Sequence, residues 1–183
     1  MVTHFPGTRM EVIPEQSKVK DIASNIIGNI FTAGGLVLSQ VCSLTGLEYY
    51  IIQNWVKRGF LSPPVKKMYS KRQFCRIVII NALKDTMQID QIVKMLSYIN
   101  GVLADESDDL IDDSELYNYF VNVTFADDGE TPPEAIVENA ITDYKEPAEG
   151  AKERLKKVLL VMYYAGLAAK NIRKSEELIA EFD

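Results

Sequence analysis

The sequence contains very little histidine and cysteine, which narrows the chemistry that it can perform. His4 is the single histidine, and Cys42 and Cys75 are the two cysteines among 183 residues. Structural zinc needs several ligands of these types, and a serine nucleophile needs a well-placed histidine base. The sequence therefore predicts no metal, no cofactor and no enzyme of the serine–histidine type. Because Cys42 and Cys75 fall in apolar helical patterns, we expect two buried thiols and no disulfide framework.

Long hydrophobic runs are also absent. No apolar stretch reaches the roughly 18 to 20 residues that a membrane-spanning helix needs. The first ten residues, MVTHFPGTRM, lack the basic start and apolar core of a signal peptide. We therefore expect a cytoplasmic protein that has no membrane partner. The 47% of hydrophobic and 25% of charged residues are typical of a folded globular chain.

One part of the chain has no acidic residue, and another has almost no basic residue. The net charge of −6 by itself argues against nucleic-acid binding. Residues 101–147, however, contain fourteen acidic residues and one basic residue, Lys145. Residues 50–84 contain no acidic residue and eight basic ones, which are Lys57, Arg58, Lys66, Lys67, Lys71, Arg72, Arg76 and Lys84. This asymmetry indicates two functional surfaces, although two solvated faces that attract each other would give the same pattern.

Apolar residues at helical spacing predict a mostly helical chain. Residues 1–14 are expected to be a loose arm, and residues 60–69, which contain two prolines, to be extended or looped. Ser70 and Gln73 match a capping box at the start of a helix. Helices are expected over residues 16–32, 38–44, 47–58, from 70, 90–100, 113–125, from 131–134, and from about 148 to 182.

The order of elements in residues 38–96 is specific. The segment LSQVCSLTGLEYYIIQNWVKRGFLSPP has a short helix, a turn at Thr45-Gly46, a second helix and a proline soon after Gly59. The segment MYSKRQFCRIVIINALKDTMQIDQIVKML continues with a helix cap at Tyr69-Ser70 and two amphipathic helices. Together they resemble the MerR family of winged helix-turn-helix proteins. The whole chain resembles most closely a bacterial family of uncharacterised proteins with a MerR-like core and added C-terminal helices.

The resemblance implies an all-α fold with three parts. Residues 1–35 would form an N-terminal arm and helix, residues 36–100 a MerR-like DNA-binding domain with a wing, and residues 101–183 an acidic helical region that ends in a long helix. It further implies a transcriptional regulator that is not an enzyme and that binds double-stranded DNA. In helix-turn-helix proteins the second helix enters the major groove while the first crosses the backbone.

The candidate DNA contacts follow from this arrangement. Ile52 and Trp55 would fix the second helix to the core, which leaves its other side for DNA. Glutamine and asparagine can pair with adenine edges, and lysine and arginine suit phosphate contacts. The candidate DNA-binding residues are Tyr49, Tyr50, Gln53, Asn54, Lys57, Arg58, Lys66, Lys67, Lys71 and Arg72.

The chain also departs from the family pattern. Gln53 stands where members usually carry arginine, Asn54 stands where they carry an aromatic residue, and the wing's arginine pair is replaced by Lys66-Lys67. The wing is short, since five residues separate Pro63 from Tyr69. These differences affect which DNA sequence is read more than they affect the fold.

The C-terminal region leaves alternatives open. The stretch VLLVMYYAGLAA in the last helix is apolar all round, so it must be covered on several sides, by a second copy in a homodimer or by the monomer's own core. The acidic run from Asp105 to Asp113 is expected to be a solvated linker and not a metal or acid–base cluster. A pocket for a small-molecule effector using Tyr119, Tyr163 and Tyr164 is neither supported nor excluded. The second functional hypothesis is a protein-interaction module that keeps the MerR-like fold without binding DNA, with residues 101–147 binding a basic partner or shielding the basic face.

Overall fold

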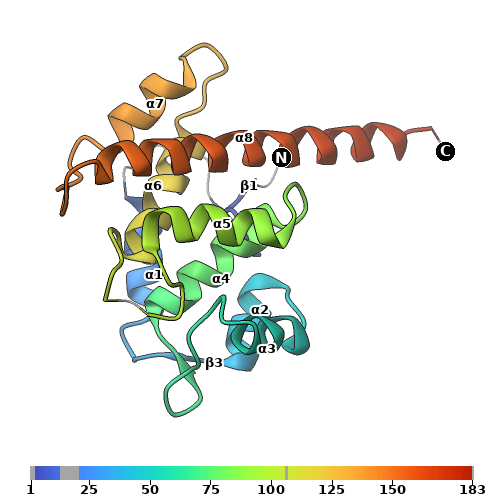
Figure 1. Cartoon of the computed structure of the whole chain (residues 1–183). Coiled ribbons are helices and arrows are strands. Elements are labelled where there is room, and N and C mark those ends of the chain that lie inside the picture. The colour runs from blue at the N-terminus through green and yellow to red at the C-terminus, as the bar shows by residue number, and fades with distance from the viewer. Residues whose placement is uncertain (1–2, 13–20, 106, 183) are drawn as a thin grey trace.

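The computed structural model describes residues 3–12, 21–105 and 107–182 of the chain. Within these residues the protein is mostly helical, which confirms the predicted all-α class (Figure 1). In chain order the elements are β1 (Thr3–His4), β2 (Glu11–Val12), α1 (Ile22–Ile30), β3 (Leu36–Val37), α2 (Leu38–Thr45), α3 (Tyr49–Lys57), β4 (Met68–Tyr69), α4 (Lys71–Leu83), α5 (Ile89–Asn100), α6 (Asp113–Phe125), α7 (Pro133–Ala140) and α8 (Ala151–Ile179).

Each helix that the apolar spacing predicts is present, with ends that differ by a few residues. The helix expected over residues 16–32 is α1, and its expected first turn lies outside the described residues. The predicted capping box is confirmed at the start of α4. The Gln73 amide N–H donates to Ser70 Oγ at 3.1 Å, and the Ser70 amide N–H donates to Gln73 Oε1 at 2.9 Å.

The first described residues form a hairpin that packs on the core, so the prediction of a loose arm was wrong for this part of the chain. Strand β1 pairs antiparallel with β2, and the Phe5 side chain is buried. The turn places Gly7 against the backbone of α4, and the Tyr117 hydroxyl donates to the Pro6 carbonyl at 2.7 Å. Strands of two residues are too short to show a period of two, which is why the sequence pattern did not reveal them.

Helix α4 is the centre of the molecule. Every residue from Gln73 to Ile80 on it is buried, and it packs against α2, α5, α6 and α8. One continuous apolar core runs from the N-terminal hairpin to α8. The predicted DNA-binding part and the acidic helical part therefore share a core.

Helices α2 and α3 lie at the end of the molecule opposite α8, together with the loop of residues 60–69 (Figure 1). From here on, helix-turn-helix is only a descriptive name for α2, the turn after it and α3, and wing is only a descriptive name for residues 60–69. Gly46, with φ of 76°, makes the turn between α2 and α3. Strand β3 pairs antiparallel with β4, so the wing returns beside the start of α2. The Asn81 side chain on α4 donates to the Thr45 carbonyl at 3.0 Å and to the Gly7 carbonyl at 2.8 Å. These contacts fix the helix-turn-helix to the central helix.

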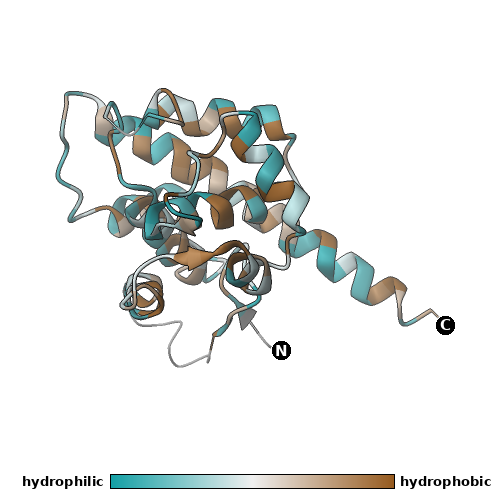
Figure 2. Ribbon diagram, turned by 90° about the horizontal axis from the view of Figure 1, so that it is seen from below, coloured by the Kyte–Doolittle hydropathy of each residue, from teal (hydrophilic) through white to brown (hydrophobic). Residues whose placement is uncertain are grey.

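Helix α8 crosses the molecule and then extends beyond it (Figures 1 and 2). Its first half is buried through Leu155, Leu159 and Met162. Residues 170–182 are all exposed. The apolar middle is not covered all round as expected, because Val161 is 41% and Tyr164 is 52% exposed. None of the helices in the described part of the chain has the length and apolarity needed to cross a membrane.

Candidate nucleic-acid interface

Helix α3 has one buried side and one solvent-facing side, as its sequence predicts. Ile52 and Trp55 are 0% and 5% exposed and pack into the core. Tyr50 is 68% exposed on the opposite side, and Tyr49, in the first turn of the helix, is 51% exposed. The other exposed candidates on this helix are Gln53, Asn54 and Lys57. The structure therefore brings five predicted DNA-contacting side chains together on one free helix face.

Arg58 follows α3 and lies at the edge of this face. Its guanidinium stacks over the Phe60 ring, 4.4 Å from the centroid, and lies 3.3 Å from Asp90 Oδ1. Both charged groups of the pair are exposed, and exposed ion pairs contribute at most about 1 kcal/mol. The pair with Asp90 therefore contributes little to the stability of the fold.

The tip of the wing is a tight turn with unusual residues. The Met68 N–H donates to the Val65 carbonyl at 2.9 Å, with Lys66 and Lys67 at the two central positions. Their φ angles are 50° and 65°, the left-handed values of a type I′ turn, where asparagine and glycine are preferred. A residue with a side chain costs roughly 1 to 2 kcal/mol in this conformation. Both lysine side chains are exposed, so the strained turn presents two cations to solvent.

Gln73 holds the base of the wing. Its side-chain amide donates to the Ser62 carbonyl at 2.8 Å and to the Pro63 carbonyl at 3.1 Å. The capping-box pattern predicts that Gln73 caps α4, but it does not predict these hydrogen bonds to the wing. The available signal was a polar residue directly before Phe74 and Cys75 in a largely apolar helix, since a buried polar side chain has to be hydrogen-bonded.

Arg72 does not face solvent with the other predicted cations. Its side chain is 18% exposed, and its guanidinium is paired with Asp109, with Asp112 at 3.7 Å and with Asp113 at 3.3 Å. Lys71, the neighbouring candidate, is half-buried at the start of α4. The expected basic surface therefore loses Arg72, because carboxylates within the chain already occupy it.

Arg76 belongs to the same buried ion cluster, which we define as Arg72, Arg76, Asp109 and Asp113. Arg76 Nη2 lies 2.8 Å from Asp113 Oδ2 and 3.6 Å from Asp109 Oδ2. The two aspartate side chains are 3% and 1% exposed. Burial raises the pKa of Asp113, and the two arginines oppose that shift.

The buried ion cluster corrects two predictions. Residues 105–113 are not simply a solvated acidic linker, because two of their carboxylates are buried against α4. The basic residues of the segment 50–84 were also expected to form one functional surface, and Arg76, which is 3% exposed, does not contribute to it. The mutual attraction of the basic and acidic segments, considered as the simpler interpretation, does occur at these four residues.

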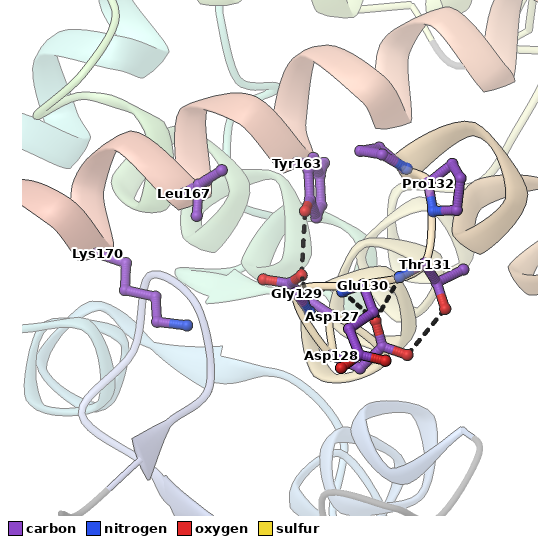
Figure 3. A pocket seen from close by; sticks show the side chains of 10 residues that line it. Asp127, Asp128, Gly129, Glu130, Thr131, Pro132, Tyr163, Leu167 and Lys170 are labelled. Carbon is purple, nitrogen blue, oxygen red and sulfur yellow. Dashed lines mark hydrogen bonds between the residues drawn. The ribbon is translucent and has the colours of Figure 1, made fainter.

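A second region was considered for a ligand, in the C-terminal helices. A hollow of about 510 Å³ lies between the α6–α7 loop and α8 (Figure 3). The Tyr163 hydroxyl donates to Asp127 Oδ1 at 3.1 Å, and Asp128 accepts backbone hydrogen bonds from Glu130 and Thr131. These hydrogen bonds lower the pKa of Asp128 to about 2. The carboxylates of Asp127 and Asp128 therefore stabilise the conformation of the loop through these hydrogen bonds.

Tyr119 and Tyr163 do not form one pocket. The Tyr119 hydroxyl donates to Glu115 and to Asp143, and its ring packs against Tyr144. Across the described residues, no group of three or more histidine, cysteine, aspartate or glutamate side chains is arranged to hold a metal ion. Of the two thiols, Cys75 is buried as predicted, and its burial raises its pKa, whereas Cys42 is only half-buried.

The comparison with protein families concerns the part of the chain that contains α3 and the wing. A family described as a domain of unknown function (DUF1836) matches residues 36–120. This match begins at β3, contains the helix-turn-helix and the wing, and ends within α6. It therefore crosses the boundary expected near residue 100 and includes the buried ion cluster.

One relative is a Bacillus subtilis (strain 168) protein with the name Uncharacterized protein YkrK. It is 35% identical over 78 residues, which cover 40% of this chain and 34% of the relative. No solved structure matches the chain significantly. Neither name mentions a MerR-like protein or DNA, so the resemblance to the MerR family stays a prediction.

Proposed function

We propose that this protein binds double-stranded DNA through the exposed face of α3 and the lysine turn of the wing. In this proposal it is a MerR-like transcriptional regulator of the cytoplasm and has no enzymatic activity. One observation carries the proposal. A free helix face with Tyr49, Tyr50, Gln53, Asn54 and Lys57 lies in one module with a strained turn that exposes two lysines.

The side chains of α3 have distinct roles in this proposal. A helix fits the major groove, which is about 12 Å wide. Gln53 and Asn54 would read adenine edges, because each amide can donate and accept a hydrogen bond at once. Tyr49 and Tyr50 would contact base edges or sugars beside them. Ile52 and Trp55 would hold the helix at a fixed depth because they are packed into the core.

The cations would position the protein on the duplex without reading its sequence. Lys57 and Arg58 would contact phosphates beside α3, and Lys66 and Lys67 would contact phosphates at the wing. Lys71 is a further phosphate contact, whereas Arg72 would remain with its carboxylates. This assignment reduces the expected cations by one and leaves them close to α3 and the wing.

A homodimer formed through α8 is part of the proposal. A two-fold axis between two copies would require two DNA half-sites related by the same symmetry. Half-sites of such dimers lie about 10 base pairs, or a multiple of this, apart.

An electrophoretic mobility shift with random-sequence duplex, at low and at high salt, tests the proposal. We expect binding that weakens steeply with salt, because phosphate contacts release counterions. The double variant Lys66→Ala/Lys67→Ala should bind more weakly, and the salt slope should fall by about one for each lysine lost. The control is Lys157→Ala, an exposed lysine on α8, which should bind like the wild type. Absence of binding even at low salt would contradict the proposal.

The second candidate is a protein-interaction module that does not bind DNA. The observation in its favour is the buried ion cluster, in which Asp109 and Asp113 already occupy two basic residues of the predicted face. If residues 101–147 act in this way on a basic partner, the mobility shift will be absent for the wild type. The same experiment therefore separates the two candidates.

A further inference from the structure

The start of α3 is the part of the candidate interface that has no cation of its own. Residues 21–56 contain no lysine or arginine, so neither α2 nor α3 has a basic residue before Lys57. The N-cap residue of α3 is Glu48, an exposed residue whose carboxylate repels phosphate. In helix-turn-helix proteins the first residues of the second helix contact base edges, so phosphates lie close to this end of the helix. A cation at the start of α3 has to come from another part of the chain.

The N-terminal hairpin brings Arg9 to this position. The Arg9 backbone N–H donates to the carbonyl of Leu44, near the end of α2, at 2.8 Å. The Arg9 guanidinium lies over the turn between α2 and α3. A Cβ atom added at Gly46 would lie 2.5 Å from Arg9 Nε and 3.0 Å from Arg9 Nη2. Arg9, Gly46 and Glu48 are all exposed, so this contact lies on the surface of the helix-turn-helix.

The hairpin holds Arg9 in a fixed place relative to α3. The Phe5 side chain is 2% exposed and anchors the hairpin in the core. The Asn81 side chain donates both to the Gly7 carbonyl in the hairpin and to the Thr45 carbonyl at the end of α2. A side chain whose backbone is already positioned loses less conformational entropy when it binds a ligand. The hairpin therefore prepares Arg9 for a contact beside α3.

The Arg9 side chain is available to an anion. Between the residues that the structure describes, no ion pair includes Arg9, although the chain has more acidic than basic residues. The planar guanidinium of arginine matches the geometry of phosphate with two parallel hydrogen bonds. The position also suits a purely structural role, because a cation near the C-terminal end of a helix such as α2 stabilises the last carbonyls. The two roles differ in what they do to DNA binding.

Arg9 completes the distribution of cations along α3. This helix has nine residues and is therefore about 13 Å long. The major groove has a similar width of about 12 Å. Lys57 and Arg58 lie at the last turn of α3, and Arg9 lies at the turn that precedes the helix. Cations at both ends can contact the two phosphate backbones that border the groove.

We propose that Arg9 contacts a DNA phosphate at the start of α3, and that the N-terminal hairpin is part of the DNA-binding surface. The inference rests on the proposed function and extends its surface to a segment that precedes the matched family region, residues 36–120. In this arrangement Arg9 offsets the charge of Glu48. The contact positions the protein and reads no base.

Titration with random-sequence duplex at several salt concentrations tests the role of Arg9. Arg9→Gln removes the charge and keeps a polar side chain over Gly46. Each neutralised phosphate adds about 0.9 to the slope of log K against log salt concentration, which amounts to about eightfold in affinity at about 0.1 M salt. We therefore expect Arg9→Gln to bind about eightfold more weakly at about 0.1 M salt, with a salt slope lower by about one. Arg9→Lys should keep most of the affinity and the wild-type slope.

The matched control is Arg154→Gln, which removes the same charge from an exposed position on α8 and should bind like the wild type. Thermal unfolding of the same variants separates the two roles of Arg9. A lower unfolding temperature of Arg9→Gln with an unchanged salt slope would show a structural role alone and overturn the inference.

The titration also distinguishes the inference from the proposed function. If Lys66→Ala/Lys67→Ala weakens binding while Arg9→Gln binds like Arg154→Gln, the inference is wrong and the proposed function stands. If the wild type binds no duplex even at low salt, both are wrong.

Discussion

Two lysines at the wing tip are the residues whose conformation is least explained by folding alone. Lys66 and Lys67 adopt left-handed φ angles in a turn that asparagine and glycine would form with less strain. Backbone strain that side chains do not relieve is commonly found where a chain binds a ligand. In our account the strain persists because the turn has to carry two cations.

Replacing Lys66 and Lys67 with residues that suit the turn should therefore raise the stability of the protein and lower its affinity for DNA. We expect Lys66→Asn/Lys67→Gly to stabilise the protein by about 1 to 2 kcal/mol, since both residues suit the turn. The same variant should bind duplex DNA more weakly, because two phosphate contacts are lost. Urea denaturation and a DNA titration measure the two effects. Lys66→Ala/Lys67→Ala is the control, and it should lose affinity without the gain in stability; unchanged affinity in both variants would count against the assigned role of the wing.

Arg76 gives a prediction that depends on pH. Arg76→Met removes a cation that lies 2.8 Å from Asp113, and breaking a buried ion pair costs about 3 to 5 kcal/mol. Burial raises the pKa of Asp113, so the folded state takes up a proton more readily than the unfolded chain. The stability lost at neutral pH should then be partly recovered as the pH falls toward the ordinary carboxyl value of about 3.9.

Denaturation of wild type and Arg76→Met at neutral and at acidic pH measures this recovery. The control is Arg58→Met, which breaks an exposed pair with Asp90 and should cost less than about 1 kcal/mol at either pH. A difference between Arg76→Met and wild type that stays constant with pH would mean that Asp113 is not held charged by Arg76.

At the scale of elements, the N-terminal hairpin fixes the position of the helix-turn-helix. Gly7 approaches α4 so closely that a Cβ atom would lie 2.0 Å from the Val78 carbonyl oxygen. Its φ of 71° is also left-handed. The hairpin and the Thr45 carbonyl share Asn81 as a hydrogen-bond donor, so a shift of the hairpin would reach α2.

Gly7→Ala should destabilise the protein by about 3 kcal/mol or more, because the clash is with backbone and adds to the strain in φ. Gly129→Ala is a matched control. Gly129 has a φ of 75° but nothing within 4 Å of the added Cβ, so it should cost only about 1 kcal/mol. Thermal unfolding compares the two variants. Equal losses would show that the hairpin does not pack as described.

The elements that the sequence predicted well are those with a long apolar period. Helices α4, α5 and α6 were expected close to their observed bounds because buried residues recur on them at helical spacing. The capping box at Ser70 located the start of α4 for the same reason, since it is a local signal. The hairpin was missed because each of its strands has two residues, and its burial depends on α4 and α6, which lie far away in the sequence.

In the candidate site, the sequence correctly predicted which side of α3 faces solvent. It wrongly predicted that the Arg72 side chain faces solvent. The exposed face of α3 can be predicted because the apolar residues Ile52 and Trp55, which define the buried side, belong to the same helix. Arg72 is buried because it pairs with Asp109 and Asp113, which come more than thirty residues later and contact it only in the folded chain. Charge counts along the sequence cannot distinguish an arginine that faces solvent from one that faces a buried carboxylate.

At the scale of the whole molecule, the two ends have different functions in our proposal, since one end would bind DNA and the other would bind a second copy. The helix-turn-helix and the wing lie at one end, and α8 lies at the other (Figure 1). Helix α4 connects them, since it carries Gln73 and Asn81 at the module and packs against α8. The net charge of −6 does not conflict with DNA binding, because acidic residues are concentrated in residues 101–147, outside α3 and the wing.

Selection of bound sequences from a random pool of duplex DNA tests the central claim most directly. We predict that the wild type enriches one motif, made of two symmetric half-sites about 10 base pairs, or a multiple of this, apart. Gln53→Ala/Asn54→Ala should change or abolish the enriched bases while leaving non-specific binding at low salt, because these side chains read bases and the lysines contact phosphates. If the wild type enriches no sequence, the claim that the exposed face of α3 reads DNA is wrong.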